Sequence, residues 1–182
     1  MDAEQQPKNA AYGRGVTRSS GSIALSIMLL LAGCDLWPAP SDASIIERFN
    51  SHRPEFNRLL EMFRHDGVFG HFHCNIPPSV PLDAPPVSQE RRAEYAKIMK
   101  AIGGDCGAYY DFGSGRAEFF MWSTGMLFAG QGKSIVYIPG GELPHVVSST
   151  DGYRWTPEDH RMGSVTLYRQ IEGPWYLLYQ AN

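Results

Sequence analysis

A nine-residue apolar run, Ile23 to Leu31, is the feature that most constrains how this chain folds. A helix that crosses a bilayer needs roughly 20 apolar residues, so this run is too short to span a membrane stably. It has the length of the apolar region of a secretory signal, and the small residues Ala32 and Gly33 that follow it suit a signal peptidase. Residues 1–33 are therefore predicted to be a signal peptide and are excluded from the prediction of the fold.

The four residues Leu31-Ala32-Gly33-Cys34 resemble the lipobox of bacterial lipoproteins. The resemblance implies that the Cys34 thiol receives a diacylglycerol, that cleavage falls directly before Cys34, and that the new amino group is acylated. Each buried CH₂ contributes about 0.8 kcal/mol, so two or three acyl chains would anchor the protein firmly. The alternative is a buried helix with an incidental cysteine. Such a helix is expected to carry polar residues on one face, and the apolar run holds only Ser26.

The residues before the apolar run fit a signal peptide poorly. Met1 to Arg14 is long and polar and contains Asp2 and Glu4. A start at Val16 leaves a compact segment with Arg18 and the terminal amine, and a valine codon can initiate translation in bacteria. We therefore expect the protein to begin at Val16, and an unusually long segment from Met1 is the alternative.

The mature chain would run from Cys34 to Asn182, which is 149 residues and enough for one domain with a hydrophobic core. It has 13 Lys and Arg against 17 Asp and Glu and no basic run, so nucleic-acid binding is not expected. Residues 34–44 contain two prolines and are interpreted as a lipidated tether of about 30 Å, with a single domain over residues 45–182. Asp35 resembles the signal that keeps lipoproteins in the inner membrane of enteric bacteria. That rule varies between lineages, so either membrane stays open.

Two cysteines, Cys74 and Cys106, remain once Cys34 is assigned to the lipid. An even pair in an exported chain indicates a disulfide, because the periplasm is oxidising. The bridge would close a loop of about 30 residues and stabilise the domain by roughly 3 to 4 kcal/mol. Two buried free thiols are the alternative.

Two helices are predicted from the spacing of apolar residues. The first carries an apolar stripe at spacings of three, four and seven: Ile45, Ile46, Phe49, Phe56, Leu59, Leu60 and Phe63. Pro54 interrupts it, so we expect a kink, a fresh helix capped by Ser51, and an end near Gly67. The stripe is interpreted as core rather than as a cofactor site. The second helix is expected over residues 89–102, capped by Ser88 and ended by two glycines.

The rest of the chain is typical of antiparallel sheet. Aromatic and β-branched segments predict strands near residues 68–75, 108–112, 117–123, 134–138, 164–170 and 175–180. Gly113-Ser114-Gly115 and the segment from Gly125 to Gly132 are expected to be turns, and residues 171–174 connect a hairpin. The predicted fold is α+β, with one or two helices packed on one face of a four- to five-stranded antiparallel sheet. The last hairpin resembles those of many small proteobacterial lipoproteins.

The segment His71-Phe72-His73-Cys74 is the densest cluster of potential ligands. In a strand, His71 and His73 point to the same face and could share a Zn²⁺ or Cu ion, but Cys74 points to the other face. A Cys74 nucleophile would need a thiolate of low pKa beside a base, and a disulfide removes that thiolate. Histidines on an exposed strand face or in a loop are the preferred interpretation, so no catalytic residue, metal site or cofactor is predicted.

Aromatic residues gather in the C-terminal half, including Trp122, Trp155 and Trp175. Core packing explains most of them, and an exposed binding patch is the alternative. The leading hypothesis is a non-enzymatic lipoprotein of the cell envelope, anchored through Cys34 on the periplasmic side, that binds another macromolecule. One version is an immunity or inhibitor protein. The alternative is an envelope enzyme or metal-binding protein that uses the His71, His73 and Cys74 segment.

Overall fold

The computed structural model describes residues 38–73, 80, 86–126, 129–140, 143–154 and 156–182, with residues 39–182 in one compact unit. Four helices are described: α2 (Asp42–Ser51), α3 (Arg53–Asp66), α4 (Gln89–Ile102) and α5 (Pro157–Met162). Six strands are described: β1 (Gly70–His73), β2 (Gly107–Asp111), β3 (Arg116–Met126), β4 (Ala129–Tyr137), β5 (Val165–Glu172) and β6 (Trp175–Ala181). The α+β class is confirmed, and the expected numbers of helices and strands were both too low. None of the described helices combines the length and apolarity needed to cross a membrane.

The break in the first predicted helix lies where the proline indicated it, but the cap is different. α2 begins at Asp42, where the Ser41 side chain accepts a hydrogen bond from the Ser44 amide. Ser51 does not cap α3, because it is the last residue of α2 and its hydroxyl donates back to the Glu47 carbonyl. His52 separates the two helices, and Pro54 lies in the first turn of α3, where a missing N–H does no harm.

The caps of α4 agree with the prediction, whereas α5 was not predicted. Ser88 accepts a hydrogen bond from the Arg91 amide, and Gly103 ends α4. α5 is a short helix with a capping box, in which the Thr156 and Asp159 side chains each accept a hydrogen bond from the other's amide. The spacing of these two residues was the signal for it.

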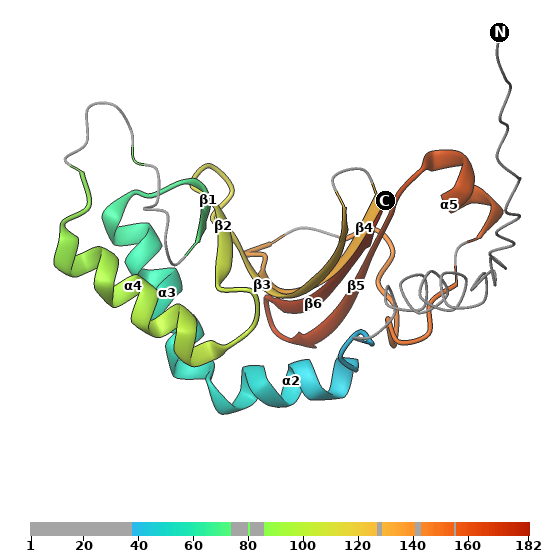
Figure 1. Cartoon of the computed structure of the whole chain (residues 1–182), viewed down its shortest axis with the longest axis horizontal. Coiled ribbons are helices and arrows are strands. Elements are labelled where there is room, and N and C mark those ends of the chain that lie inside the picture. The colour runs from blue at the N-terminus through green and yellow to red at the C-terminus, as the bar shows by residue number, and fades with distance from the viewer. Residues whose placement is uncertain (1–37, 74–79, 81–85, 127–128, 141–142, 155) are drawn as a thin grey trace, which may run out of the picture. The chain divides into compact units, whose positions relative to one another are not determined.

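The six strands form one antiparallel sheet in the order β1-β2-β3-β4-β6-β5 (Figure 1). The turn expected at Gly113-Ser114-Gly115 is confirmed between β2 and β3. The turn expected from Gly125 to Gly132 is wrong, because β3 continues to Met126 and β4 starts at Ala129. The backbone N–H and C=O groups of a glycine can still pair with a neighbouring strand. In this ladder Gly130 lies opposite Gly125, and Gly132 lies opposite Ser123.

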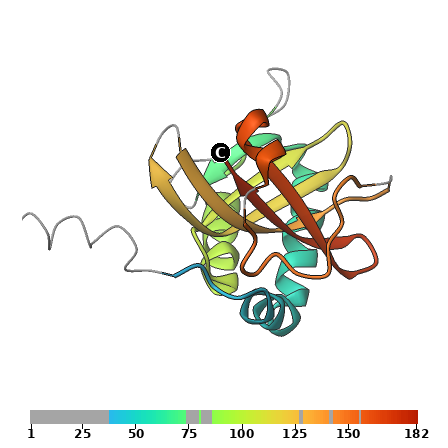
Figure 2. The same ribbon diagram turned by 90° about the vertical axis from the view of Figure 1, so that its right-hand side faces the viewer.

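One face of the sheet carries the main hydrophobic core. The stripe predicted on α2 and α3 is confirmed as core except at Ile46, which is only half-buried, and Phe49, Phe56 and Phe63 are fully buried. These rings pack against strand residues such as Phe119 and Trp175, at centroid distances of 5.1 Å for Phe56–Phe119 and 5.0 Å for Phe49–Trp175. Tyr179 and its β5 neighbours continue the core on this face beneath residues 147–153. In Figure 2, with α5 nearest the viewer, α2 is seen nearly end-on below the strands.

Candidate functional site

The other face of the sheet is filled at one end and hollow at the other. Where Val136, Tyr168 and Leu178 meet, a small apolar cluster covers the strands. Further along β4 the side chains on this face shrink to Ser134 and then to glycine at positions 132 and 130. The result is a cavity of about 670 Å³, which lies within the range of about 300 to 1,000 Å³ typical of ligand sites.

Aromatic rings form one wall of the cavity. His71 and His73 of β1 and Phe120 of β3 all line it, and the rings of His71 and Phe120 lie nearly parallel with centroids 6.0 Å apart. The prediction that the two histidines share a face is therefore confirmed. Gly107 on β2 makes room for this wall, because a Cβ atom there would come within 2.6 Å of Phe120 Cδ2 and 2.8 Å of His73 Cε1.

Polar side chains form the floor and the opposite wall. Ser134 of β4, Thr166 of β5 and Gln180 of β6 line the cavity, and Ser134 is only 6% exposed. Within the described part of the chain, none of these three side chains hydrogen-bonds to another protein group. Ser134 is buried, where a hydroxyl normally has a partner, whereas Thr166 is half-buried and Gln180 is exposed. All three side chains are therefore available to a ligand or to water.

The charged groups of the cavity are two carboxylates, and each of them interacts with another side chain. Asp105 accepts a hydrogen bond from the Ser123 hydroxyl, and Glu118 pairs with Arg116 at 3.1 Å between Nη2 and Oε2. Among the described residues that line the cavity, none is a lysine or an arginine. Negatively charged ligands are therefore disfavoured at this face.

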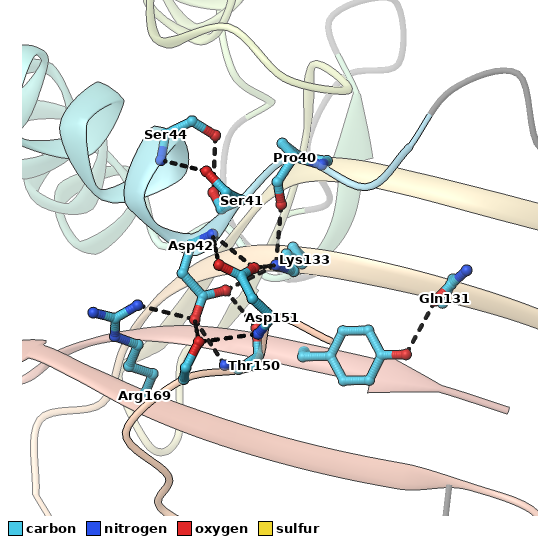
Figure 3. A network of polar contacts seen from close by, with 11 residues as sticks. Pro40, Ser41, Asp42, Ser44, Gln131, Lys133, Thr150, Asp151 and Arg169 are labelled. Atoms are coloured by element: carbon cyan, nitrogen blue, oxygen red, sulfur yellow. Dashed lines mark hydrogen bonds and ion pairs between the residues drawn. The ribbon is translucent and has the colours of Figure 1, made fainter. Parts of the chain in front are cut away.

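A second polar cluster lies on the helix-covered face, between the start of α2 and β4 (Figure 3). Asp42 is fully buried and Lys133 is 2% exposed, and their Oδ1 and Nζ atoms are 2.8 Å apart. The Lys133 ammonium also donates to Asp151 at 2.6 Å and to the Pro40 carbonyl at 3.0 Å. Arg169 donates to the second oxygen of Asp42 at 3.0 Å.

The hydrogen bonds of this cluster keep Asp42 ionised. Burial alone would raise the pKa of the Asp42 carboxyl, but hydrogen bonds from Lys133, Thr150 and Arg169 together lower it well below its usual value. The hydroxyl and amide of Thr150 donate to it at 2.6 and 2.7 Å. These polar groups are hydrogen-bonded to one another. The cluster is therefore best explained as a structural contact that fixes α2 to the sheet.

The structure places the other predicted site residues as follows. Cys34, Cys74 and Trp155 lie outside the described residues, so lipidation and the disulfide stay predictions. Trp175 belongs to the core, and Trp122 is half-buried and lines the cavity. Considering only the described residues, no three His, Cys, Asp or Glu side chains are grouped so that they could hold a metal ion.

The structure describes only one of the two cysteines of the predicted disulfide. Cys106 directly precedes β2, whereas Cys74 directly follows β1 in the sequence and lies outside the described residues. The bridge therefore stays a prediction from the sequence.

Comparisons with protein-family models, curated proteins and solved structures found no match to this chain. The candidate site therefore rests on geometry alone. Sequence reasoning singled out His71 and His73 but missed the floor of the cavity. The available signal was the run of small residues at alternate positions, Gly130, Gly132 and Ser134, within a strand.

Proposed function

We propose that this chain is a non-enzymatic binding protein of the bacterial cell envelope, anchored in a membrane through lipid on Cys34. The anchor is inferred from the lipobox-like stretch before Cys34 and places the domain on the periplasmic side. The observation that carries the binding function is the hollow on the open face of the sheet. It combines a ring wall with hydrogen-bonding groups that no described residue uses.

The arrangement of the cavity favours binding over catalysis. A nucleophile needs a base within hydrogen-bond reach, and a base is commonly oriented by a third group. In the described region, the rings of His71 and His73 contact aromatic rings, and the Ser134 hydroxyl has no basic partner. Asp105 and Glu118 are each held by another side chain rather than by a histidine.

Metal binding is the second candidate function, because His71 and His73 share a face of β1 at the cavity. Metal analysis of the purified chain, with and without reductant, distinguishes the two candidates. Stoichiometric zinc or copper that is lost on replacing His71 and His73 would favour the metal site over the binding function. The immunity or inhibitor version requires a protein partner and is a separate proposal.

A matched pair of tryptophan variants tests the binding function. Thr166→Trp places a large ring in the cavity from β5, whereas Gln170→Trp places the same ring on the same face of the same strand, outside the cavity. Both positions are expected to tolerate an aromatic residue, because aromatic side chains are favoured in strands. The full chain, purified from membranes in detergent, is screened by thermal shift against a library of small polar compounds.

We expect compounds that raise the melting temperature of the wild type and of Gln170→Trp but not that of Thr166→Trp. Thr166→Val, which keeps the size of the side chain and removes its hydroxyl, separates the effect of bulk from the effect of one hydrogen bond. Absence of any stabilising compound would contradict the proposal, as would compounds that stabilise Thr166→Trp equally well.

A further inference from the structure

We infer that the cavity on the open face binds a saccharide that carries no negative charge. This inference rests on the proposed binding function and adds the chemical class of the ligand. Three features of the cavity carry it: its ring wall, its unused hydrogen-bonding groups and its charge.

The aromatic rings that line one wall of the cavity favour a ligand with a flat apolar face. His71 is exposed, Phe120 is half-buried, and their nearly parallel rings present aromatic surface to the cavity. His73 extends this wall, with its ring centroid 6.4 Å from that of Phe120. The C–H groups on one face of a pyranose ring stack well on such a surface, because an aromatic face is electron-rich and a C–H group is weakly positive.

The polar side chains on the floor and the opposite wall favour a ligand with several hydroxyl groups. The Ser134 and Thr166 hydroxyls each donate and accept, and the Gln180 amide does both through two different atoms. They come from three neighbouring strands, so their hydrogen-bonding groups are spread across the floor rather than aligned along one edge. A sugar carries hydroxyls around its ring and matches this spread, whereas a nucleobase concentrates its polar atoms along the edges of its plane.

The charge of the cavity disfavours anionic sugars. Asp105 and Glu118 line it, and although Arg116 pairs with Glu118, no lysine or arginine is among the described lining residues to receive an anion. The carboxylates also offer strong acceptors to the hydroxyl groups of a sugar. We therefore expect neutral or N-acetylated sugars to bind and uronic acids to be rejected.

Isothermal titration calorimetry on the detergent-solubilised full chain tests this inference with five probes. They are maltotriose, N,N′,N″-triacetylchitotriose, trigalacturonate, adenosine and choline chloride. We expect one of the first two to bind with heat that saturates, and trigalacturonate to bind at least about tenfold more weakly. Saturable binding of adenosine or choline alone, tighter binding of trigalacturonate, or binding of none of the five would overturn the inference.

Two phenylalanine variants locate the binding. Phe120→Leu keeps an apolar side chain but removes the flat ring from the cavity, and we expect affinity to fall about fivefold or more. Phe112→Leu makes the same change at a 62%-exposed phenylalanine between β2 and β3 and should leave affinity unchanged. Equal affinities of the wild type and Phe120→Leu would also overturn the inference.

If no sugar binds but library compounds lose their effect in Thr166→Trp, the saccharide inference fails while the binding function stands. If both experiments fail, the function itself is wrong.

Discussion

The ammonium of Lys133 lies 2.8 Å from Oδ1 of Asp42, and both side chains are shielded from solvent. Lys133 projects from β4 and Asp42 opens α2, so this contact joins the first described helix to the centre of the sheet. A buried charge that loses its partner destabilises a protein by roughly 3 to 5 kcal/mol. We expect Asp42→Asn to lower the free energy of unfolding by about this amount, as measured by urea denaturation.

Asp151→Asn is the matched control for this change. Asp151 accepts a hydrogen bond from the same lysine at 2.6 Å, but its side chain is 42% exposed. Water can replace much of its interaction, so we expect a loss of about 1 kcal/mol. Equal losses in the two variants would show that burial of Asp42 is not what makes the contact strong.

The same cluster predicts how stability depends on pH. The hydrogen bonds to Asp42 hold the pKa of its carboxyl below the unfolded value in spite of its burial. The stabilisation is therefore fully present above the unfolded-state pKa of about 3.9 and is lost as pH falls toward the folded-state pKa. Between about pH 5 and pH 2 the free energy of unfolding should fall, and it should fall less steeply in Asp42→Asn. Urea unfolding across this range measures both slopes, and identical slopes would refute the assignment.

A smaller cluster joins α3 to α4. The Arg91 guanidinium donates to both oxygens of Asp66, at 2.7 and 3.2 Å, and the Tyr95 hydroxyl donates to the same carboxylate at 2.8 Å. We expect Asp66→Asn to cost about 1 to 3 kcal/mol, because a partly buried guanidinium and phenol lose a charged acceptor. Thermal unfolding measures the effect. Glu94→Gln, which changes a more exposed partner of Arg91, should cost less, and the reverse order would argue against this account.

The predicted disulfide between Cys74 and Cys106 has a direct mass test. The unreduced exported chain should be two mass units lighter than its reduced form, since forming one bridge releases two hydrogens. We expect Cys106→Ala to lower the free energy of unfolding by about 3 to 4 kcal/mol under oxidising conditions and much less in reductant. Recovery of two thiols that react with an alkylating reagent would disprove the bridge.

Lipidation at Cys34 predicts the location of the chain in the cell. We expect the wild type to sediment with membranes and to be released by detergent, and Cys34→Ser to lose the lipid-dependent attachment. Cell fractionation followed by mass analysis of the N-terminal peptide measures both properties. Wild-type protein without acyl mass, or a serine variant that still needs detergent for release, would contradict a lipid anchor.

The parts of this fold that sequence predicts are those set by local pattern. The apolar spacing of α2 and α3 and the caps Ser88 and Gly103 of α4 depend on residues within a few positions of one another, and they were found. The glycines of β4 misled, because glycine signals a turn in isolation and only the neighbouring strands make it part of a ladder.

The candidate site depends on long-range pairing, which a single sequence does not encode in any local signal. His71 and His73 were singled out by composition, but Phe120, Ser134 and Thr166 join them only through the order of strands in the sheet. The Asp42–Lys133 contact likewise spans 91 positions of sequence. No local pattern links the two residues.

Chemical footprinting of the histidines tests the binding cavity most directly. Diethyl pyrocarbonate modifies accessible histidine rings, and peptide mass spectrometry measures the modification of each histidine in the wild-type full chain. His71 and His73 line the cavity, whereas His65, on α3 with its side chain 85% exposed, is an internal control in the same protein. With a saturating amount of the tightest-binding compound from the screen, we expect modification of His71 and His73 to slow several-fold while that of His65 is unchanged. Unchanged rates at His71 and His73 would contradict the account, because the ligand would then bind elsewhere.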